Sequence, residues 1–498
     1  MKKNINRDRC CIVSLVLLVS IVASLSLIPG SFWGDDYAAY ISDGIAMAEG
    51  SYGEKITLNP LMHPTNLPEN KDEVAELVYV RGVPLLYALI YRLAGFEPDG
   101  SNLIWYKLPN VIFLSLCAVV FYFFLRRKEY SPLFSFLLAL IFSLHKETLS
   151  LVDNCETDIF FCFFSLLSVL LTEEYVKTPP GSRKTALAIG LGFSLWFGLE
   201  IRLNGTTLVF LFLYASLRHF FRKGRKLPDR SFFLPLAIPL IGKTLLNCFL
   251  PAPTSNLSDF GLSDLGTVVD NCIAYFDMSC HWFGRIFWVN SSTVPPFFCW
   301  IIPRFFEYIG FCKVTLSEEN STVVFAFGTM VVLIALPYTQ GYRYFLNVLP
   351  YFLYFSAEGW SIIAEKLFCH VRWKPFFASV LSVAIVFGTA SSLLGFAEKR
   401  RNYASDSRNA FNADAVDMYS YIRRELPEDS VVYFFKPRLL YLTTHRLGCA
   451  QTAERYWDNN PADYFLSCPV FGSCLGSAVY EEEPLYANET MALYRIKR

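Results

Sequence analysis

The chain has 498 residues, of which 53% are hydrophobic, 17% aromatic and 18% charged, and its 44 basic residues balance 44 acidic ones. A soluble protein carries about 25% charged residues, and here the apolar residues gather into long runs, so the composition excludes an ordinary soluble fold and indicates a polytopic membrane protein. No basic cluster gives the electrostatic footprint of a nucleic-acid-binding protein.

The first predicted element is an apolar run over residues 11–30, preceded by Lys2, Lys3, Arg7 and Arg9. A basic start followed by an apolar run is typical of a signal peptide. This run is too long for the apolar region of a signal peptide and lacks a cleavage site of small residues. We therefore expect it to remain as the first membrane span.

The segment after this run, from Trp33 to Gly50, opens with the adjacent acids Asp35 and Asp36. If the segment is helical from Asp36 on, Tyr40 and Asp43 share a face with Asp36, and an apolar stripe lies beside them. This pattern predicts a helix resting on the membrane surface. The two acids either cap that helix or take part in chemistry, and the two roles are compatible.

A second surface helix is predicted over residues 79–96. Gly82 and Pro84 break the chain before an apolar stretch, and Arg92 interrupts that stretch too much for a confident membrane span. We expect both surface helices to lie in one long loop, residues 31–105.

Further apolar runs raise the predicted number of spans to about eleven. They cover residues 106–125, 131–145, 158–172, 185–201, 205–221, 231–250, 294–312, 321–338, 344–362 and 375–396. Clusters of Lys and Arg fall in alternate loops on the side of the N-terminus, which predicts that this side is cytoplasmic. The loops 31–105 and 251–293 and the C-terminal part are then expected on the outer face.

The last hundred residues regain charge and soluble-type patterns. Residues 412–426 predict a helix stopped by Pro427, and residues 430–435, 462–468 and 491–496 predict strands. We expect a membrane module over residues 1–396 and a small extracytoplasmic α/β domain over residues 397–498. Cys468 and Cys474 can form a disulfide if this end faces an oxidising space.

Ionisable side chains recur where the predicted spans meet the outer face. Besides the first-loop acids, they are Glu156 and Asp158 at the start of the fourth span, Glu200 and Arg202 between two spans, and Arg343, followed by Tyr344, between two others. A charge within a span is costly, so a charge at its edge beside a water-filled cavity is a candidate functional group.

This inventory meets the needs of sugar transfer from a lipid phosphate. A carboxylate must take the proton of the acceptor hydroxyl, and cations must hold the departing phosphate. Asp35 or Asp36 is the candidate base, and Arg202, Arg343 and Arg81 are candidate phosphate ligands because a planar guanidinium fits two oxygens.

Other interpretations of the same residues stay open. Asp36 and Asp158 can instead hold a divalent cation. Glu156 and Asp158 can merely cap their helix, Arg343 and Tyr344 can anchor a span at headgroup depth, and Arg81 can extend toward lipid headgroups.

The order of these motifs resembles the GT-C superfamily of integral-membrane glycosyltransferases, which includes the protein O-mannosyltransferases of family 39 and the bacterial lipid A aminoarabinose transferase. The matching positions are Gly34, Asp35, Asp36 and Tyr37 after the first span, Asp158 at the fourth, Arg202 and Gly205 after the fifth, and Gly341, Arg343, Tyr344 and Pro350 at a late span. Tyr79, Gly82 and Pro84 match a proline-rich turn of the family only in part.

The resemblance implies a multi-pass protein of the plasma or inner membrane, with about eleven helices and an outer α/β domain. It also implies an inverting transfer of a hexosyl or pentosyl group from a polyprenyl-phosphate-linked donor to a lipid, glycan or protein acceptor on the outer face. The base is then a first-loop Asp, and Asp36 is favoured because it shares a helix face with Tyr40.

A non-catalytic assembly protein whose C-terminal domain binds a partner is one alternative, and a transporter or flippase of a lipid-linked saccharide is another. A transporter or flippase needs polar groups near the membrane midplane and broken helices in related halves. The charges of this sequence are instead predicted to collect at one face.

Overall fold

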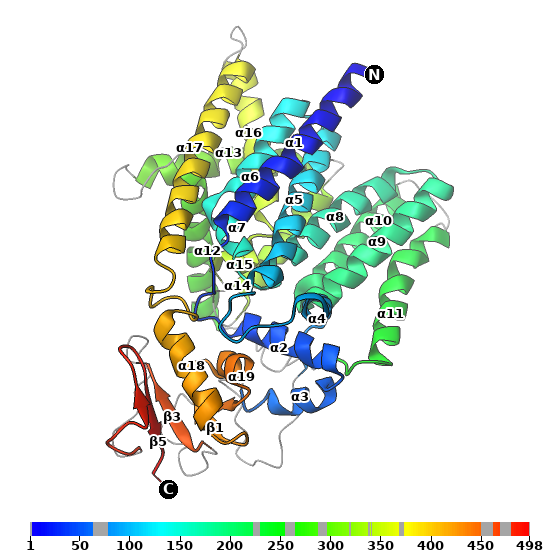
Figure 1. Ribbon diagram of the computed structural model, residues 1–498. Helices are drawn as coiled ribbons and strands as arrows, with labels where there is room; N and C mark the ends of the chain where they lie inside the picture. Colours follow the sequence, from blue (N-terminus) through cyan, green and yellow to red (C-terminus); the bar gives the residue numbers. More distant parts are fainter. Residues whose placement is uncertain are drawn as a thin grey trace.

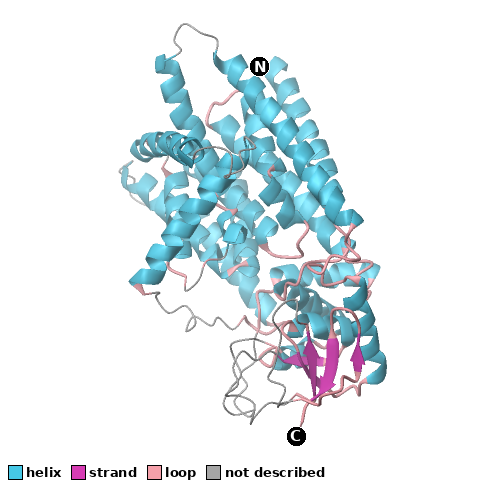
Figure 2. Cartoon of the chain, turned by 90° about the vertical axis from the view of Figure 1, so that its left-hand side faces the viewer, coloured by secondary structure: helices cyan, strands magenta, loops and turns pink. Residues whose placement is uncertain are grey.

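The computed structural model describes residues 2–62, 78–222, 230–253, 264–286, 296–317, 320–336, 339, 341–367, 373–449, 462–468 and 480–497. Long helices form a bundle, and a small domain with a β-sheet lies at the end of the bundle away from the chain's N-terminus (Figures 1 and 2). Two kinds of structure therefore follow from two kinds of sequence: apolar runs build the bundle, and the charged C-terminal residues build the domain.

The bundle consists of helices that the apolar runs predicted for the most part. They are α1 (Lys2–Ser26), α5 (Ile104–Arg127), α6 (Pro132–Leu144), α7 (Lys146–Val152), α8 (Asp158–Lys177), α9 (Ser182–Ile201), α10 (Thr206–Arg222), α11 (Leu234–Asn247), α12 (Leu265–Ile286), α13 (Pro296–Leu316), α14 (Ser321–Ile334), α15 (Gly341–Phe345), α16 (Leu349–Leu367) and α17 (Trp373–Arg401). Each predicted apolar run falls on one of these helices. Helix α12 instead lies in residues expected to form an outer loop, because its Asp, Asn and His residues interrupt the apolar run that marks a span.

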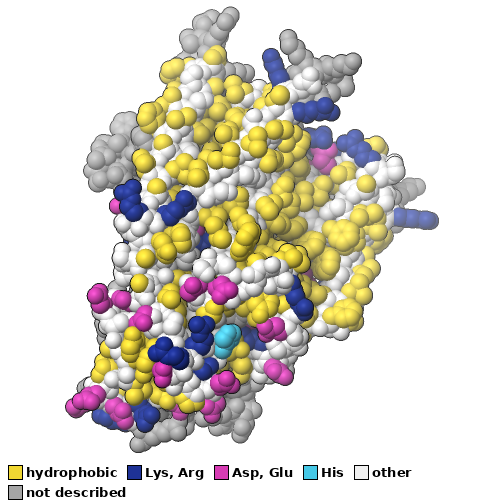
Figure 3. Space-filling model, in the orientation of Figure 1, with side chains coloured by type: hydrophobic (Ala, Val, Ile, Leu, Met, Phe, Trp, Pro, Cys, Tyr) yellow, Lys and Arg dark blue, Asp and Glu magenta, His cyan; other side chains and the backbone are white. Residues whose placement is uncertain are grey.

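Among the described residues, five helices are long and apolar enough to cross a membrane individually: α1, α5, α8, α9 and α17. Helices α6 and α7 add a candidate span that bends by 59° at their junction. The protein is therefore a multi-pass membrane protein, and the total of eleven spans stays a prediction. Apolar side chains cover much of the bundle surface, whereas charged side chains gather on the C-terminal domain and near the N-terminal end (Figure 3).

Three short helices of the first loop lie between the bundle and the C-terminal domain: α2 (Asp36–Glu49), α3 (Tyr52–Leu58) and α4 (Gly82–Ala94). Helices α2 and α4 confirm the predicted helical stretches, whereas α3 was not predicted. Helix α2 packs directly against α4. At their contact a side chain on Gly44 would lie 2.9 Å from the Pro84 carbonyl oxygen, so the close approach of the two helices requires a glycine there.

The C-terminal domain is the predicted α/β unit. Its sheet has the order β2-β1-β3-β5-β4, built from β1 (Val431–Tyr433), β2 (Leu447–Cys449), β3 (Tyr464–Ser467), β4 (Tyr486–Ala487) and β5 (Ala492–Arg495). Strand β1 pairs in parallel with β2 and β3, whereas β5 pairs antiparallel with β3 and β4. The predicted helix is α18 (Ala413–Glu425), and Asn412 caps it by accepting a hydrogen bond from the Ala415 N–H. Cys474 lies outside the described residues, so its disulfide with Cys468 stays a prediction.

A further helix of this domain, α19 (Pro437–Thr444), was not predicted, and it packs against α2. Neighbouring contacts join the domain to the start of the first loop. The Trp33 indole N–H donates to the Ser407 carbonyl at 2.6 Å, and the Ala410 N–H donates to the Ser31 carbonyl at 2.7 Å. Helix α17 runs past the predicted boundary at residue 396 and leads into the domain. The C-terminal domain thus packs on the layer that the first loop forms at this end of the bundle.

Replacing Gly44 by Ala should destabilise this layer. The added methyl group meets backbone atoms, which cannot move aside like a flexible side chain, and such overpacking costs about 1–3 kcal/mol. The measurement is the midpoint of thermal unfolding in detergent. Gly53 is the matched control because it is also helical and a side chain there meets nothing within 4 Å. An equal midpoint for Gly44→Ala and Gly53→Ala would contradict the close packing of α2 on α4.

Candidate functional site

Asp35 caps a helix, but not the helix that follows it. Its side chain makes no capping hydrogen bond to α2. Instead Asp35 Oδ1 accepts a hydrogen bond from the backbone N–H of Arg438, at the start of α19, at 3.1 Å. Its Oδ2 lies 3.4 Å from Arg438 Nε. Burial raises the pKa of the Asp35 carboxyl, and the nearby cations Arg438 and Lys436 oppose that rise.

Asp36 lies between two arginines that come from distant parts of the chain. Its Oδ2 is 3.3 Å from Arg343 Nη1, and its Oδ1 is 3.3 Å from Arg438 Nη1. The Asp36 side chain is 46% exposed, against 13% for that of Asp35. Of these two adjacent acids, Asp36 is therefore the more accessible to an incoming molecule.

Arg343, on α15, joins the first loop to the start of α8. Its Nε lies 2.8 Å from Glu156 Oε2 and 3.4 Å from Asp158 Oδ2, and both acidic side chains are only 2% exposed. Burial raises the pKa of the Glu156 carboxyl well above its ordinary value, and Arg343 opposes that rise. Glu156 and Asp158 thus do more than cap α8, and Arg343 does more than anchor a span at headgroup depth.

Arg202, at the end of α9, holds Asp158 from the other side. Its Nη2 contacts Asp158 Oδ1, its Nε donates to Thr157 Oγ1 at 2.7 Å, and its guanidinium lies 4.2 Å from the centre of the Tyr344 ring. Its Nη1 is buried and has no hydrogen-bond partner among the described residues. Arg202 thus retains one unused donor beside the acids, and its binding of substrate stays a prediction.

The turn after α9 explains the spacing of Arg202 and Gly205. A side chain on Gly205 would lie 2.5 Å from the Gly198 carbonyl oxygen, so the chain can fold back on α9 only with a glycine there. The tight turn aims Arg202 back toward Asp158. Gly341 has a comparable role before Arg343, because its φ of 64° lies in the left-handed region that favours glycine.

Arg81 does not join this cluster through direct contact with its acids. Its guanidinium is fully buried, pairs with Glu200 at 3.1 Å and donates to Asn247 at 2.8 Å and to the carbonyls of Leu250 and Pro251. These contacts connect α4 to α9 and to the end of α11. They do not show the predicted extension of Arg81 toward lipid headgroups, and its predicted binding of substrate stays a prediction.

Arg438 is the site residue that sequence reasoning missed. Its Nη2 donates to the Tyr79 hydroxyl and its guanidinium lies 4.9 Å from the centre of the Tyr79 ring, in addition to its contacts with Asp35 and Asp36. A signal for its helix was present, since Pro437 suits the first position of a helix and Leu439, Leu440 and Thr443 follow with helical spacing. No local signal linked that helix to the first loop.

The two acids predicted to hold a divalent cation lie around an arginine. Asp36 and Asp158 both face the Arg343 guanidinium, which supplies positive charge between them. Within the described ranges no cluster of three or more His, Cys, Asp or Glu side chains is suited to a metal ion. A divalent cation at Asp36 and Asp158 stays a prediction.

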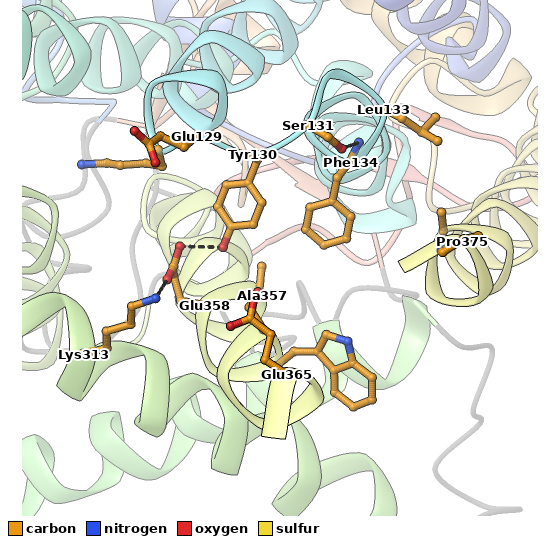
Figure 4. Close-up of a pocket in the computed structure, with 14 residues that line it drawn as sticks. Glu129, Tyr130, Ser131, Leu133, Phe134, Lys313, Ala357, Glu358, Glu365 and Pro375 are labelled. Atoms are coloured by element: carbon orange, nitrogen blue, oxygen red, sulfur yellow. Dashed lines mark hydrogen bonds and ion pairs between the residues drawn. The ribbon is translucent and has the colours of Figure 1, made fainter. Parts of the chain in front are cut away.

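A separate cavity of about 470 Å³ lies beside the turn between α5 and α6, and it shares no residue with the acidic cluster (Figure 4). Within it Glu358 accepts a hydrogen bond from the Tyr130 hydroxyl at 2.7 Å and pairs with Lys313 at 2.7 Å. The cavity is therefore distinct from the candidate site.

Comparison with known proteins agrees with the motif order. The family model of dolichyl-phosphate-mannose-protein mannosyltransferases matches residues 73–245. Among curated proteins the sequence has no significant match. The structure is similar to ArnT from Cupriavidus metallidurans bound to undecaprenyl phosphate, with 12% identity, a TM-score of 0.53 and 97% of each chain covered. It is also similar to ArnT from the same organism in the apo state, with 11% identity, a TM-score of 0.54 and 97% of each chain covered. The chain therefore shares the fold of these ArnT structures, and the matched residues 73–245 agree with the resemblance drawn from the sequence.

Proposed function

We propose that the protein is an inverting glycosyltransferase that moves a sugar from a polyprenyl-phosphate-linked donor to an acceptor on the outer face of the membrane. The observation that carries this proposal is the half-exposed Asp36 carboxylate, held between two arginines next to the buried acids of α8. The fold shared with an undecaprenyl-phosphate-bound protein and the match to the mannosyltransferase model support the donor class.

Asp36 has the better position for a general base. Both oxygens of Asp35 contact Arg438 and the side chain is largely buried, whereas Asp36 keeps 46% of its side chain exposed. Asp36 can therefore accept the proton of the acceptor hydroxyl as the hydroxyl oxygen bonds to the sugar's anomeric carbon. Attack from the face opposite the phosphate inverts that carbon.

The leaving group is the polyprenyl phosphate, which keeps the electron pair of the broken carbon–oxygen bond. Arg343, with a quarter of its side chain exposed, and the unpartnered Nη1 of Arg202 can bind its oxygens. Because both arginines are held by buried carboxylates, they need little rearrangement when the charge on the phosphate develops.

The outer-face assignment rests on charge. The last turn of α5 carries Arg126 and Arg127, and Lys128 follows it, at the end of the bundle near the N-terminus, where Arg126 pairs with Asp8. The candidate site lies at the other end. Since basic residues concentrate on the cytoplasmic side of membrane proteins, this distribution favours a site on the outer face.

Replacing Asp36 by Asn should lower the rate of sugar transfer by about 10²–10⁴-fold, because the amide cannot accept the proton. The measurement is transfer of labelled sugar from undecaprenyl phosphate sugars to membranes of cells that lack the protein. Asp153→Asn is the control, since Asp153 is also an acid in an ion pair, with Lys107 at 2.6 Å, but lies outside the cluster. Transfer at the wild-type rate by Asp36→Asn would rule out this base.

Replacing Arg343 by Gln should raise the KM for the donor by at least about tenfold, which corresponds to about 1.4 kcal/mol, a typical scale for hydrogen bonds to charged groups. Arg343→Lys should recover little, because a lysine lacks the planar fork that contacts two phosphate oxygens. The control is Arg126→Gln, which breaks an ion pair with Asp8 at the other end of the bundle. Unchanged donor KM in both Arg343 variants would contradict phosphate binding by Arg343.

A vesicle assay tests the flippase alternative. If the wild-type protein moves lipid-linked sugar across the vesicle membrane and makes no transfer product, the result would support a flippase instead.

A further inference from the structure

One arginine of the C-terminal domain reaches the acids of the first loop. Arg438 Nη1 lies 3.3 Å from Asp36 Oδ1 and its Nε lies 3.4 Å from Asp35 Oδ2, while its own side chain is only 7% exposed. Asp36 precedes Arg438 by 402 residues. The contact therefore exists only when the domain is docked on the first loop.

The docking of the domain on the first loop does not by itself explain why Arg438 is buried beside Asp36. The domain already contacts the first loop through Trp33 and Ser407, through Ser31 and Ala410, and through Lys55 Nζ, which lies 4.9 Å from the centre of the Tyr441 ring. Burying a guanidinium costs desolvation free energy, and a buried ion pair often adds no net stability compared with apolar packing. A buried arginine aimed at the exposed carboxylate suggests a role beyond adhesion.

The two arginines at Asp36 divide its carboxylate between them. Arg343 contacts Oδ2 and Arg438 contacts Oδ1, so each oxygen has one cationic donor. This arrangement fixes the plane of the carboxylate and leaves a lone pair on each oxygen for an incoming hydroxyl. Without Arg438, the carboxylate can rotate and turn both oxygens toward Arg343.

Arg438 is itself held rigidly. Its backbone N–H donates to Asp35, its side chain donates to the Tyr79 hydroxyl, and its guanidinium lies 4.9 Å from the centre of the Tyr79 ring. Asp35 thus fixes the start of α19, and α19 in turn presents Arg438 to Asp36.

We propose that Arg438 is a positioning residue for sugar transfer, so that the C-terminal domain completes the active site by orienting the Asp36 carboxylate. This inference rests on the proposed function, with Asp36 as the base. It assigns the adjacent acids different tasks: Asp36 meets the acceptor, and Asp35 secures the helix that carries Arg438.

The test compares the full-length wild-type protein with Arg438→Gln and Arg438→Lys in detergent. The donors are undecaprenyl phosphate mannose and undecaprenyl phosphate aminoarabinose, and the acceptors are membranes of cells that lack the protein. We expect Arg438→Gln to lower kcat by about 10²-fold, since displacing a catalytic group by about 1 Å has an effect of that size. The KM for the donor should stay unchanged, because Arg438 contacts the base rather than the phosphate. Arg438→Lys should recover part of kcat by restoring one charged contact.

Arg446→Gln is the matched control. Arg446 is also a buried arginine of the C-terminal domain, but it donates to the carbonyls of Leu426, Arg423 and Thr444 and touches none of the clustered acids. We expect Arg446→Gln to lower the unfolding midpoint of the domain while kcat of the folded protein stays near the wild-type value. Protease resistance of the domain, measured for each variant, separates misfolding from misplacement of Asp36.

Three outcomes would overturn the inference. Wild-type kcat in folded Arg438→Gln would show that Asp36 needs no second arginine. Equal losses in Arg438→Gln, Arg438→Lys and Arg446→Gln, in parallel with protease sensitivity, would show a purely structural role. A wild-type protein that transfers sugar from neither donor would overturn the proposed function and this inference together, whereas the first two outcomes overturn the inference alone.

Discussion

The ion pairs around Arg343 are the constraint on which the rest of the site depends. Carboxylates and guanidinium groups lose hydration free energy when they are buried at the end of an apolar bundle, so each must find a partner of opposite charge. Arg343 meets Asp36, Glu156 and Asp158, and Arg202 holds Asp158 from the far side. The result is a network that ties the first loop, α8, α9 and α15 together and leaves Asp36 as its exposed member.

That network gives a physical reason for the layered architecture at this end of the molecule. The apolar helices supply a rigid support of low polarity, in which the electrostatic attraction between paired groups is stronger than in water. The first loop covers the support, and the C-terminal domain covers the loop. Each layer contributes charged groups: Asp158 and Arg202 from the bundle, Asp35 and Asp36 from the loop, and Arg438 from the domain. A site of this kind needs all three layers in register.

Particular residues show where sequence reasoning succeeded and where it failed. The acids after the first span, the acids opening α8 and the arginines after α9 and before α16 were all identified as candidates. The structure joins them in one network, except that Asp35 contacts Arg438 and Arg81 lies outside the network. Arg81 pairs with Glu200 instead, because α4 packs against α9 and brings those groups together. Helix α12 was not predicted because its polar residues interrupt the apolar run in the sequence. Helix α19 was not predicted either, although Pro437 marks its start.

Local patterns of the sequence by themselves determined the membrane class, most of the helices, the predicted strands of the C-terminal domain and the set of ionisable candidates. These features depend on hydrophobic periodicity, turn residues and composition, which act over a few neighbouring residues. The tertiary structure decided which acidic side chain pairs with which basic one. Ion pairing across hundreds of residues depends on how helices pack, and no local pattern records that packing, so only the folded chain showed that Asp35 caps α19 and that Arg438 reaches Asp36.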